Sequence, residues 1–584
     1  MASARSTISL SSQSSHHGFS KNSFPWQLRH SRFVMGSRAR TCACMSSSVS
    51  LPTATTSSSV ITGNDALLKY IRQPMVIPLK EKEGTKRREY LLEKTARELQ
   101  GTTEAAEKLK FIDTIQRLGI SCYFEDEING ILQAELSDTD QLEDGLFTTA
   151  LRFRLLRHYG YQIAPDVFLK FTDQNGKFKE SLADDTQGLV SLYEASYMGA
   201  NGENILEEAM KFTKTHLQGR QHAMREVAEA LELPRHLRMA RLEARRYIEQ
   251  YGTMIGHDKD LLELVILDYN NVQAQHQAEL AEIARWWKEL GLVDKLTFAR
   301  DRPLECFLWT VGLLPEPKYS ACRIELAKTI AILLVIDDIF DTYGKMEELA
   351  LFTEAIRRWD LEAMETLPEY MKICYMALYN TTNEICYKVL KKNGWSVLPY
   401  LRYTWMDMIE GFMVEAKWFN GGSAPNLEEY IENGVSTAGA YMALVHLFFL
   451  IGEGVSAQNA QILLKKPYPK LFSAAGRILR LWDDLGTAKE EEGRGDLASS
   501  IRLFMKEKNL TTEEEGRNGI QEEIYSLWKD LNGELISKGR MPLAIIKVAL
   551  NMARASQVVY KHDEDSYFSC VDNYVEALFF TPLL

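Results

Sequence analysis

Apolar residues recur every three or four positions along most of the chain, which is the spacing of a buried helical face. Leu92, Ala96 and Leu99 follow this spacing, and residues 109–118 repeat it. No stretch of useful length alternates apolar and polar residues as a half-buried strand does. The pattern predicts packed α-helices, and short glycine-containing breaks such as 199–202 suit antiparallel neighbours.

The length and apolar content of the predicted helices change near residue 290. Short helices are predicted over 65–290 and longer apolar helices over 291–584, with a break at Gly291 just after Trp286 and Trp287. No repeat with the period of a solenoid is visible. We therefore predict an all-α fold with an N-terminal helical domain at 65–290 and a C-terminal helical domain at 291–584.

The first 64 residues differ in composition from the rest. They are rich in serine and contain six basic residues, from Arg5 to Arg40, before the first acidic residue, Asp65. This is the composition of an organellar transit peptide, because a secretory signal needs a compact apolar segment. A disordered tail is the alternative. Since serine far outnumbers arginine, we predict a plastid transit peptide at 1–64 and a location in the chloroplast stroma.

Composition and charge narrow the class of protein. Hydrophobic residues make up 45% of the chain and charged residues 25%, which excludes a collagenous or mostly disordered chain. The net charge of −12 disfavours nucleic acid as a partner. The longest apolar stretches, 330–336 and 443–451, are far shorter than the roughly 20 residues of a membrane span. We expect a soluble protein without a membrane span.

The cysteines do not indicate a metal or disulfide framework. There are eight of them, scattered without any CxxC or Cys/His spacing. Buried free thiols are the expected state of those outside the leader.

Three carboxylates end a strongly apolar helix in the second half. Asp337, Asp338 and Asp341 follow the apolar run 330–336. Positions i and i+4 share a helical face, so Asp337 and Asp341 should project side by side. Two such carboxylates repel each other and lose hydration unless a cation lies between them, and hard oxygen ligands suit Mg²⁺ or Mn²⁺. An isolated pair of aspartates is often merely solvated, but the apolar run favours a metal site.

A second acidic stripe has the same helical spacing. Asp483, Thr487 and Glu491 stand at i, i+4 and i+8, so their oxygens line one face and can chelate one divalent ion. A solvated acidic helix is the alternative for this stripe alone. Two stripes in one helical domain favour a metal-lined mouth.

The metal and the nearby basic residues indicate a phosphorylated substrate. Mg²⁺ keeps several waters and shares its ligands with substrate phosphates. Arg300 and Arg302 precede the first stripe, and Arg480 lies one turn before the second. Each arginine alone is as well explained by a surface ion pair, but together with the metals they would neutralise a diphosphate leaving group.

These motifs together resemble those of the plant class I terpene synthases. The matching segments are the arginine pair at 300–302, DDxxD at 337–341, DDxxTxxxE at 483–491, Trp309, and Leu-Tyr-Glu-Ala-Ser at 192–196. The resemblance covers about 65–584. It implies a relict class II-type N-terminal α-barrel and a C-terminal class I terpenoid synthase helical bundle that binds three Mg²⁺ or Mn²⁺ ions. No class II DxDD motif is visible, because 138–141 lacks the last aspartate.

The resemblance implies the metal ligands and the diphosphate-binding residues. Metal ions would be bound on one side of the mouth by Asp337 and Asp341, with Asp338 in support, and on the other side by Asp483, Thr487 and Glu491. Substrate would be held through these aspartates and directly by Arg300, Arg302 and Arg480.

Further residues are implied for the carbocation. Trp309, with Tyr560 or Phe340, would supply aromatic faces to a cation in a dry pocket, although core packing is the common role of a single aromatic residue. Asp565 matches a position at the active-site lid that the family sometimes connects with proton handling, but the surrounding residues depart from the commoner glycine-rich version. The segment 434–439 resembles the family's helix break; an ordinary kinked helix is the alternative.

One departure from the family bears on the product. Cyclising monoterpene synthases usually carry two arginines followed eight residues later by tryptophan, whereas here Arg87 and Arg88 are followed at that position by Arg97. This absence resembles the subgroup that makes acyclic alcohols, such as the linalool and nerolidol synthases. Many relatives also have a basic residue where Ser499 stands, so the grip on diphosphate is expected to be weaker. A weaker grip disfavours the isomerisation that must precede cyclisation, and water capture ends the reaction.

The predicted activity is conversion of geranyl diphosphate to an acyclic alcohol of linalool type, with farnesyl diphosphate to nerolidol as a further activity. A cyclic or olefinic monoterpene synthase is the alternative. A chain-elongating prenyl diphosphate synthase is a disfavoured alternative, because such an enzyme usually has a second DDxxD where this chain has Thr487 and Glu491. A non-catalytic helical binding protein is the remaining alternative. We expect a monomer whose partner is a small prenyl diphosphate.

Overall fold

The computed structural model describes residues 81–137, 145–421, 425–464, 466–494, 498–537, 539, 541–560 and 571–584. These residues are helical almost throughout, and the one extended pairing among them is an isolated bridge between Thr172 and Phe178. The prediction of an all-α fold is confirmed. All of them lie in one compact unit, Val60–Leu584. The predicted leader at 1–64 and Asp565 lie outside the described residues.

The first half of the described chain contains α-helices of 8 to 32 residues. Its α-helices are α2 (Glu81–Gly101), α3 (Ala105–Arg117), α4 (Glu125–Ser137), α5 (Leu146–His158), α6 (Thr186–Ser196), α7 (Asn204–Leu217), α8 (Arg225–Glu232), α9 (Ala240–Thr253) and α10 (Lys259–Leu290). Its 3₁₀ turns are η1 (Ser121–Tyr123), η3 (Pro165–Phe171), η4 (Glu180–Leu182) and η5 (Arg235–Leu237).

The second half was predicted to have the longer helices, but its longest described helices have 25 residues, fewer than the 32 of α10. The α-helices are α11 (Leu292–Lys295), α12 (Pro303–Leu313), α13 (Ser320–Asp338), α14 (Met346–Arg358), α15 (Glu369–Asn393), α16 (Leu398–Gly421), α17 (Leu427–Thr437), α18 (Ala440–Ile451), α19 (Ala457–Gln461), α20 (Lys470–Arg494), α21 (Ser500–Lys508), α22 (Glu513–Ile536), α23 (Leu543–Tyr560) and α24 (Val571–Val575). The 3₁₀ turns are η6 (Pro317–Tyr319), η8 (Glu362–Thr366) and η9 (Ile462–Leu464), and the π-helices are η7 (Ile339–Tyr343) and η10 (Glu576–Phe580).

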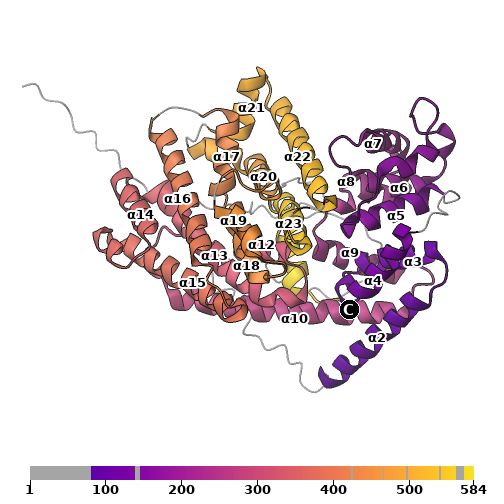
Figure 1. Ribbon diagram of the computed structural model, residues 1–584, viewed down its shortest axis with the longest axis horizontal. Helices are drawn as coiled ribbons and strands as arrows, with labels where there is room; N and C mark the ends of the chain where they lie inside the picture. The colour runs from indigo at the N-terminus through magenta and orange to yellow at the C-terminus, as the bar shows by residue number, and fades with distance from the viewer. Residues whose placement is uncertain are drawn as a thin grey trace, which may run out of the picture. The chain divides into compact units, whose positions relative to one another are not determined.

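The long helix α10 contacts both halves of the chain (Figure 1). Asp258 is the N-cap of α10, and its side chain accepts hydrogen bonds from the backbone N–H groups of Asp260 and Leu261. The helix ends at Gly291, which has the left-handed φ of 64° that favours glycine. It packs against α2 and α9 on one side and against α12 and α13 on the other. The predicted domain boundary near residue 290 falls at the end of this helix and stays a prediction.

Helix α18 is the centre of the second half. All twelve of its residues are buried, and it packs against α13, α16, α17, α20 and α23. Among the described residues no single helix is long and apolar enough to cross a membrane, and the pair α17 and α18 reaches that hydropathy only when taken together across a 40° bend. The bend lies at Gly439, whose φ is 71°, within the segment predicted as a helix break.

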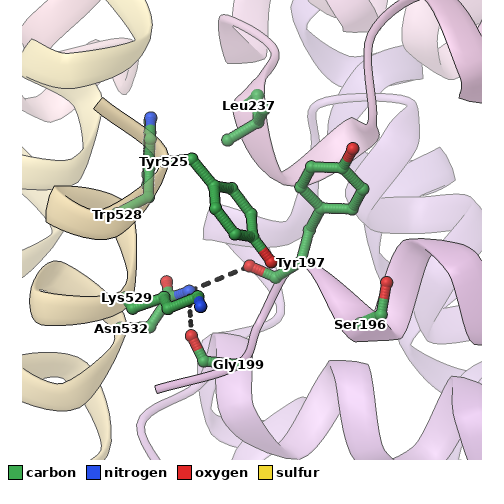
Figure 2. A pocket seen from close by; sticks show the side chains of 8 residues that line it. All are labelled: Ser196, Tyr197, Gly199, Leu237, Tyr525, Trp528, Lys529 and Asn532. Atoms are coloured by element: carbon green, nitrogen blue, oxygen red, sulfur yellow. Dashed lines mark hydrogen bonds between the residues drawn. The ribbon is translucent and has the colours of Figure 1, made fainter. Parts of the chain in front are cut away.

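Helix α22 forms hydrogen bonds with the segment that follows α6. Figure 2 shows the Asn532 side chain donating to the carbonyl oxygens of Tyr197 and Gly199, each at 2.9 Å. Tyr525 and Trp528 line the small cavity beside these bonds. None of the predicted site residues lines this cavity.

Helices α20 and α23 approach each other closely at Gly486. A Cβ atom added there would lie 2.7 Å from the backbone oxygen of Tyr560, and backbone cannot rotate away as a side chain can. Gly130 is also a helical glycine, but its added Cβ would meet nothing within 4 Å.

Substituting these two glycines should shift stability in opposite directions. Gly486→Ala is expected to destabilise the protein by about 1–3 kcal/mol because of overpacking. Gly130→Ala should stabilise it by about 0.5–1 kcal/mol, since alanine favours the helix. Melting temperatures measured at one scan rate test this, and a stabilising Gly486→Ala would contradict the close approach.

Candidate active site

The first acidic cluster lies where α13 gives way to a π-helical turn. Asp337 and Asp338 end α13, whereas Asp341 lies in η7. The Asp337 side chain is 24% exposed and that of Asp338 is 8% exposed, and Asp341 is exposed. A regular α-helix was expected here. The π turn, with its i to i+5 hydrogen bonds, replaces that register beyond Asp338.

The segment before α12 holds Arg300 against this cluster. The backbone N–H of Arg300 donates to Oδ2 of Asp338 at 2.9 Å, and its Nε lies 2.7 Å from Oδ1 of the same residue. Its Nη2 donates to the Asp337 carboxylate. Phe298 stacks on Tyr343 of η7 with ring centroids 4.0 Å apart, which ties the segment to the π turn. Arg300 therefore bridges both aspartates.

Arg302 faces a different carboxylate. Its Nη1 donates to Oε1 of Glu305 at 2.9 Å, in the first turn of α12. Between the two arginines, Asp301 accepts a hydrogen bond from the indole N–H of Trp287 at 2.9 Å. The structure thus brings Arg300 to the acidic cluster and pairs Arg302 with Glu305.

Burial and neighbouring charges shift the pKa values of the groups in the first cluster. Burial raises the pKa of Asp338 to about 6, although the Arg300 guanidinium opposes this rise. Burial alone would lower the pKa of Arg300, but the carboxylates of Asp337, Asp338 and Asp341 raise it above its ordinary value. The cluster carries more negative charge than one arginine neutralises.

The second acidic cluster lies on α20. Arg480 forms ion pairs with Asp484, at 2.9 Å, and with Asp483, at 3.5 Å. Asp483 is 19% exposed, whereas Asp484 is fully buried. The Thr487 hydroxyl donates a hydrogen bond to the carbonyl oxygen of Asp483 at 2.9 Å. Glu491 lies two turns from Asp483 in the same helix, but its side chain is outside the described part of the structure.

Glu415 of α16 interacts electrostatically with a residue of each cluster, and sequence reasoning missed it. Its Oε1 accepts from the hydroxyl of Thr437 at 2.8 Å and from the amide of Asn433 at 3.0 Å. Burial raises its pKa to about 7; Arg480 opposes this rise and Asp337 adds to it. One carboxyl is therefore close enough to interact electrostatically with a residue of each cluster, so both clusters face the same region.

The sequence contained a weak signal for Glu415. It is a single carboxylate that follows the apolar residues 412–414 in a helical pattern. Asp484 gave a weaker signal still, because nothing in a DD pair tells which aspartate is buried.

Two of the predicted aromatic residues meet beside the second cluster. The rings of Trp309 and Tyr560 have centroids 5.9 Å apart. Burial raises the pKa of Tyr560 well above its ordinary value, and a hydrogen bond with Asp483 raises it further. Phe340 packs elsewhere, against Phe412 and its neighbours in the core.

The donor set suits a hard divalent cation. Both clusters offer carboxylate and hydroxyl oxygens, which Mg²⁺ and Mn²⁺ prefer. Within the described residues no three His, Cys, Asp or Glu side chains converge as a preformed metal site. Ions at these clusters would therefore complete their coordination with water and substrate phosphate, as Mg²⁺ commonly does.

Two family models match the chain. Residues 64–240 match "Terpene synthase, N-terminal domain" and residues 288–530 match "Terpene synthase family, metal binding domain". Three similar proteins align over the full length of both chains: a chloroplastic monoterpene synthase of Cananga odorata (64% identical), and the chloroplastic geraniol synthase (65%) and R-linalool synthase (61%) of Ocimum basilicum.

Solved structures share the fold. Limonene synthase with 2-fluorolinalyl diphosphate is 36% identical, with a TM-score of 0.83, over 88% of this chain and 97% of that one. Isoprene synthase from grey poplar (Populus x canescens), in complex with three Mg²⁺ ions and dimethylallyl-S-thiolodiphosphate, is 37% identical, with a TM-score of 0.81, over 86% and 97%. The predicted two-domain helical architecture is confirmed, while its exact boundaries stay predictions.

Replacing Glu415 should change how stability depends on pH. Its pKa in the folded protein lies above the 4.5 of an ordinary glutamate, so the stability it contributes is present below about pH 4.5 and is lost as the pH rises through about 7. Glu415→Gln should reduce this loss by up to about 1.4 kcal/mol per pH unit. Denaturant midpoints between pH 5 and 7, measured with a chelator present, test this.

Glu410→Gln is the matched control, because it removes a half-exposed carboxyl from the same helix. Equal pH slopes for Glu415→Gln and the unaltered protein would contradict the burial of Glu415.

Proposed function

Because the chain belongs to the terpene synthase family, we propose that it ionises geranyl diphosphate in a metal-dependent step and releases an acyclic monoterpene alcohol. The observation that carries this proposal is the pair of aspartate–arginine clusters on α13 and α20, which face the same region around Glu415. The identity of 61% to 65% with chloroplastic monoterpene synthases supports the ten-carbon substrate.

The proposed ionisation depends on stabilising the leaving diphosphate. Arg300, Arg302 and Arg480 would donate charged hydrogen bonds to it, and such preorganised donors act most strongly where negative charge develops. Arg300 and Arg480 are already held in place by aspartates. Arg302 would exchange Glu305 for the diphosphate.

The metal ligands we propose are the outward-facing oxygens of both clusters. Asp337 and Asp341 would hold ions on one side, and Asp483, Thr487 and Glu491 on the other. Mg²⁺ or Mn²⁺, three ions by analogy with the isoprene synthase complex, would supply Lewis-acid stabilisation of the diphosphate. Asp338 supports this group through Arg300, which occupies both of its oxygens.

The allylic cation left behind needs a π-rich, water-poor surface. When the C–O bond breaks, the bonding pair leaves with the diphosphate, and Trp309 and Tyr560 present adjoining ring faces to the cation. A water oxygen then bonds to the cation and loses a proton to the released diphosphate or to solvent. Attack at C3 gives linalool, and attack at C1 gives geraniol.

Two departures from the cyclising pattern support an acyclic product. The tryptophan that follows the arginine pair in the cyclising enzymes is replaced here by Arg97, and the pair itself lies in α2 and binds acids of α10: Arg87 binds Asp260 and Glu263, and Arg88 binds Asp268. Where many relatives have a basic residue, Ser499 is the N-cap of α21 and brings no charge to the diphosphate.

Product analysis tests the proposed activity. Purified protein with Mg²⁺ and geranyl diphosphate is expected to give linalool as its main product in chiral gas chromatography. A dominant cyclic product or olefin would overturn the acyclic alcohol. Farnesyl diphosphate in a parallel incubation is expected to give nerolidol.

Geraniol is the second candidate product. It is favoured by the 65% identity with a geraniol synthase, and its appearance would retain the alcohol while placing water capture at C1. Because the relatives are chloroplastic, we further propose a location in the plastid stroma, and a monomer as the active form.

Replacing Asp337 tests the first metal-binding side. Asp337→Ala is expected to lower turnover about 100-fold or more, the scale on which loss of one such electrostatic group acts, without lowering the melting temperature. The matched control is Asp530→Ala, which removes a 25% exposed aspartate paired with Lys470 on another face. Retained turnover in purified Asp337→Ala would contradict the assigned role.

Calorimetric titration of Mg²⁺ with pyrophosphate distinguishes the enzyme from a non-catalytic helical protein, which should show no metal-dependent binding.

A further inference from the structure

Asp484 follows Asp483 in α20 but faces the interior. Its Oδ1 lies 2.9 Å from Nη2 of Arg480 and accepts the Tyr430 hydroxyl at 3.1 Å. Its Oδ2 accepts the backbone N–H of Ser500 at 2.7 Å. Protein donors thus occupy both carboxylate oxygens, and one buried side chain joins α20, α17 and the first residue of α21.

Arg480 is confined on its other sides as well. Its guanidinium lies over the Tyr430 ring, 4.9 Å from the centroid, and its Nη2 donates a hydrogen bond to the Tyr430 hydroxyl. These two contacts hold the guanidinium in place. The absence of a side chain at Gly434 makes room for it, since a Cβ there would lie 2.7 Å from Cγ of Arg480. The other end of the guanidinium, Nη1, lies toward the outward-facing Asp483.

This confinement matters for binding an anion. A long arginine side chain loses rotamer freedom when it binds, unless the protein has already fixed it. A prefixed guanidinium can present its N–H groups to a diphosphate without that loss.

We propose that Asp484 is a positioning residue that holds Arg480 in the orientation that binds diphosphate, and that it does not ligate metal. The inference rests on the proposed function, because it presumes that Arg480 meets a diphosphate.

The other cluster repeats the arrangement independently. There Asp337 is the more exposed aspartate and Asp338 is buried against Arg300. Consecutive helical residues point about 100° apart, so when the first aspartate of a pair faces the mouth, the second turns toward the arginine that supports it. In each cluster one arginine contacts both aspartates, although Arg480 belongs to the same helix as its aspartates and Arg300 comes from the segment before α12.

The test compares Asp484→Asn with Tyr430→Phe in the full-length protein. Asp484→Asn keeps the shape but removes the charge that holds Arg480, and is expected to raise both the Kd of inorganic pyrophosphate at saturating Mg²⁺ and the KM for geranyl diphosphate by about tenfold or more. The Mg²⁺ concentration for half-maximal turnover should stay unchanged. Tyr430→Phe should raise the same two constants less, and it keeps the inference testable if Asp484→Asn does not fold.

Two controls separate positioning from other roles. Asp268→Asn removes a side chain of similar burial, 2% exposed and paired with Arg88 at 2.6 Å in the first half of the chain, so it should lower the melting temperature and leave pyrophosphate binding intact. Asp483→Asn should raise the Mg²⁺ requirement, as expected for a metal ligand.

The inference is overturned if Asp484→Asn binds pyrophosphate as the unaltered protein does, if it raises the Mg²⁺ requirement as Asp483→Asn does, or if Asp268→Asn weakens pyrophosphate binding equally. Failure of the proposed function looks different: the unaltered protein would bind pyrophosphate with Mg²⁺ yet make no alcohol, and the comparison of Kd values would still decide the role of Asp484. No binding of pyrophosphate by the unaltered protein would overturn both.

Discussion

The site depends on keeping a high density of negative charge in a protein interior. A buried carboxylate is tolerated only when charged or hydrogen-bonding partners replace its lost water. In both clusters an arginine does this for the inner aspartate: Arg300 for Asp338 and Arg480 for Asp484. The outer aspartates, Asp337 and Asp483, stay partly exposed, so the same ion pairs that make burial of the inner aspartates tolerable leave one aspartate of each pair at the surface of its cluster.

The helical core determines where these pairs lie. Because α18 is buried along its whole length, α13, α16, α20 and α23 must pack around it. Glycines permit two of the close approaches in this region: Gly434 contacts Arg480, and Gly486 contacts the backbone of Tyr560. Packing and chemistry are linked here, since the glycine contacts that bring the helices together also bring the charged and aromatic groups to one region.

The proposed function follows from the balance of charge in this site. Arginines and divalent ions would stabilise the departing diphosphate, while the adjoining rings of Trp309 and Tyr560 would face the cation without offering a counter-charge. The arginine pair that in cyclising relatives precedes a tryptophan binds acids of α10 here, and Ser499 caps α21. In this proposal a cation held less tightly by its leaving group is open to water, which leaves the product acyclic.

The sequence by itself determined the helical class and the composition of the two clusters, because residues spaced by three or four share a helical face whatever surrounds them. It grouped Arg480 with Asp483 along one helix for the same reason. Only the tertiary structure decided which aspartate of each pair is buried, that Arg300 contacts both Asp337 and Asp338, and that Glu415 interacts with Asp337 and Arg480. Local sequence sets the angle of a side chain around its own helix, whereas burial, pKa and partners depend on helices that are distant in the chain and meet only when it folds.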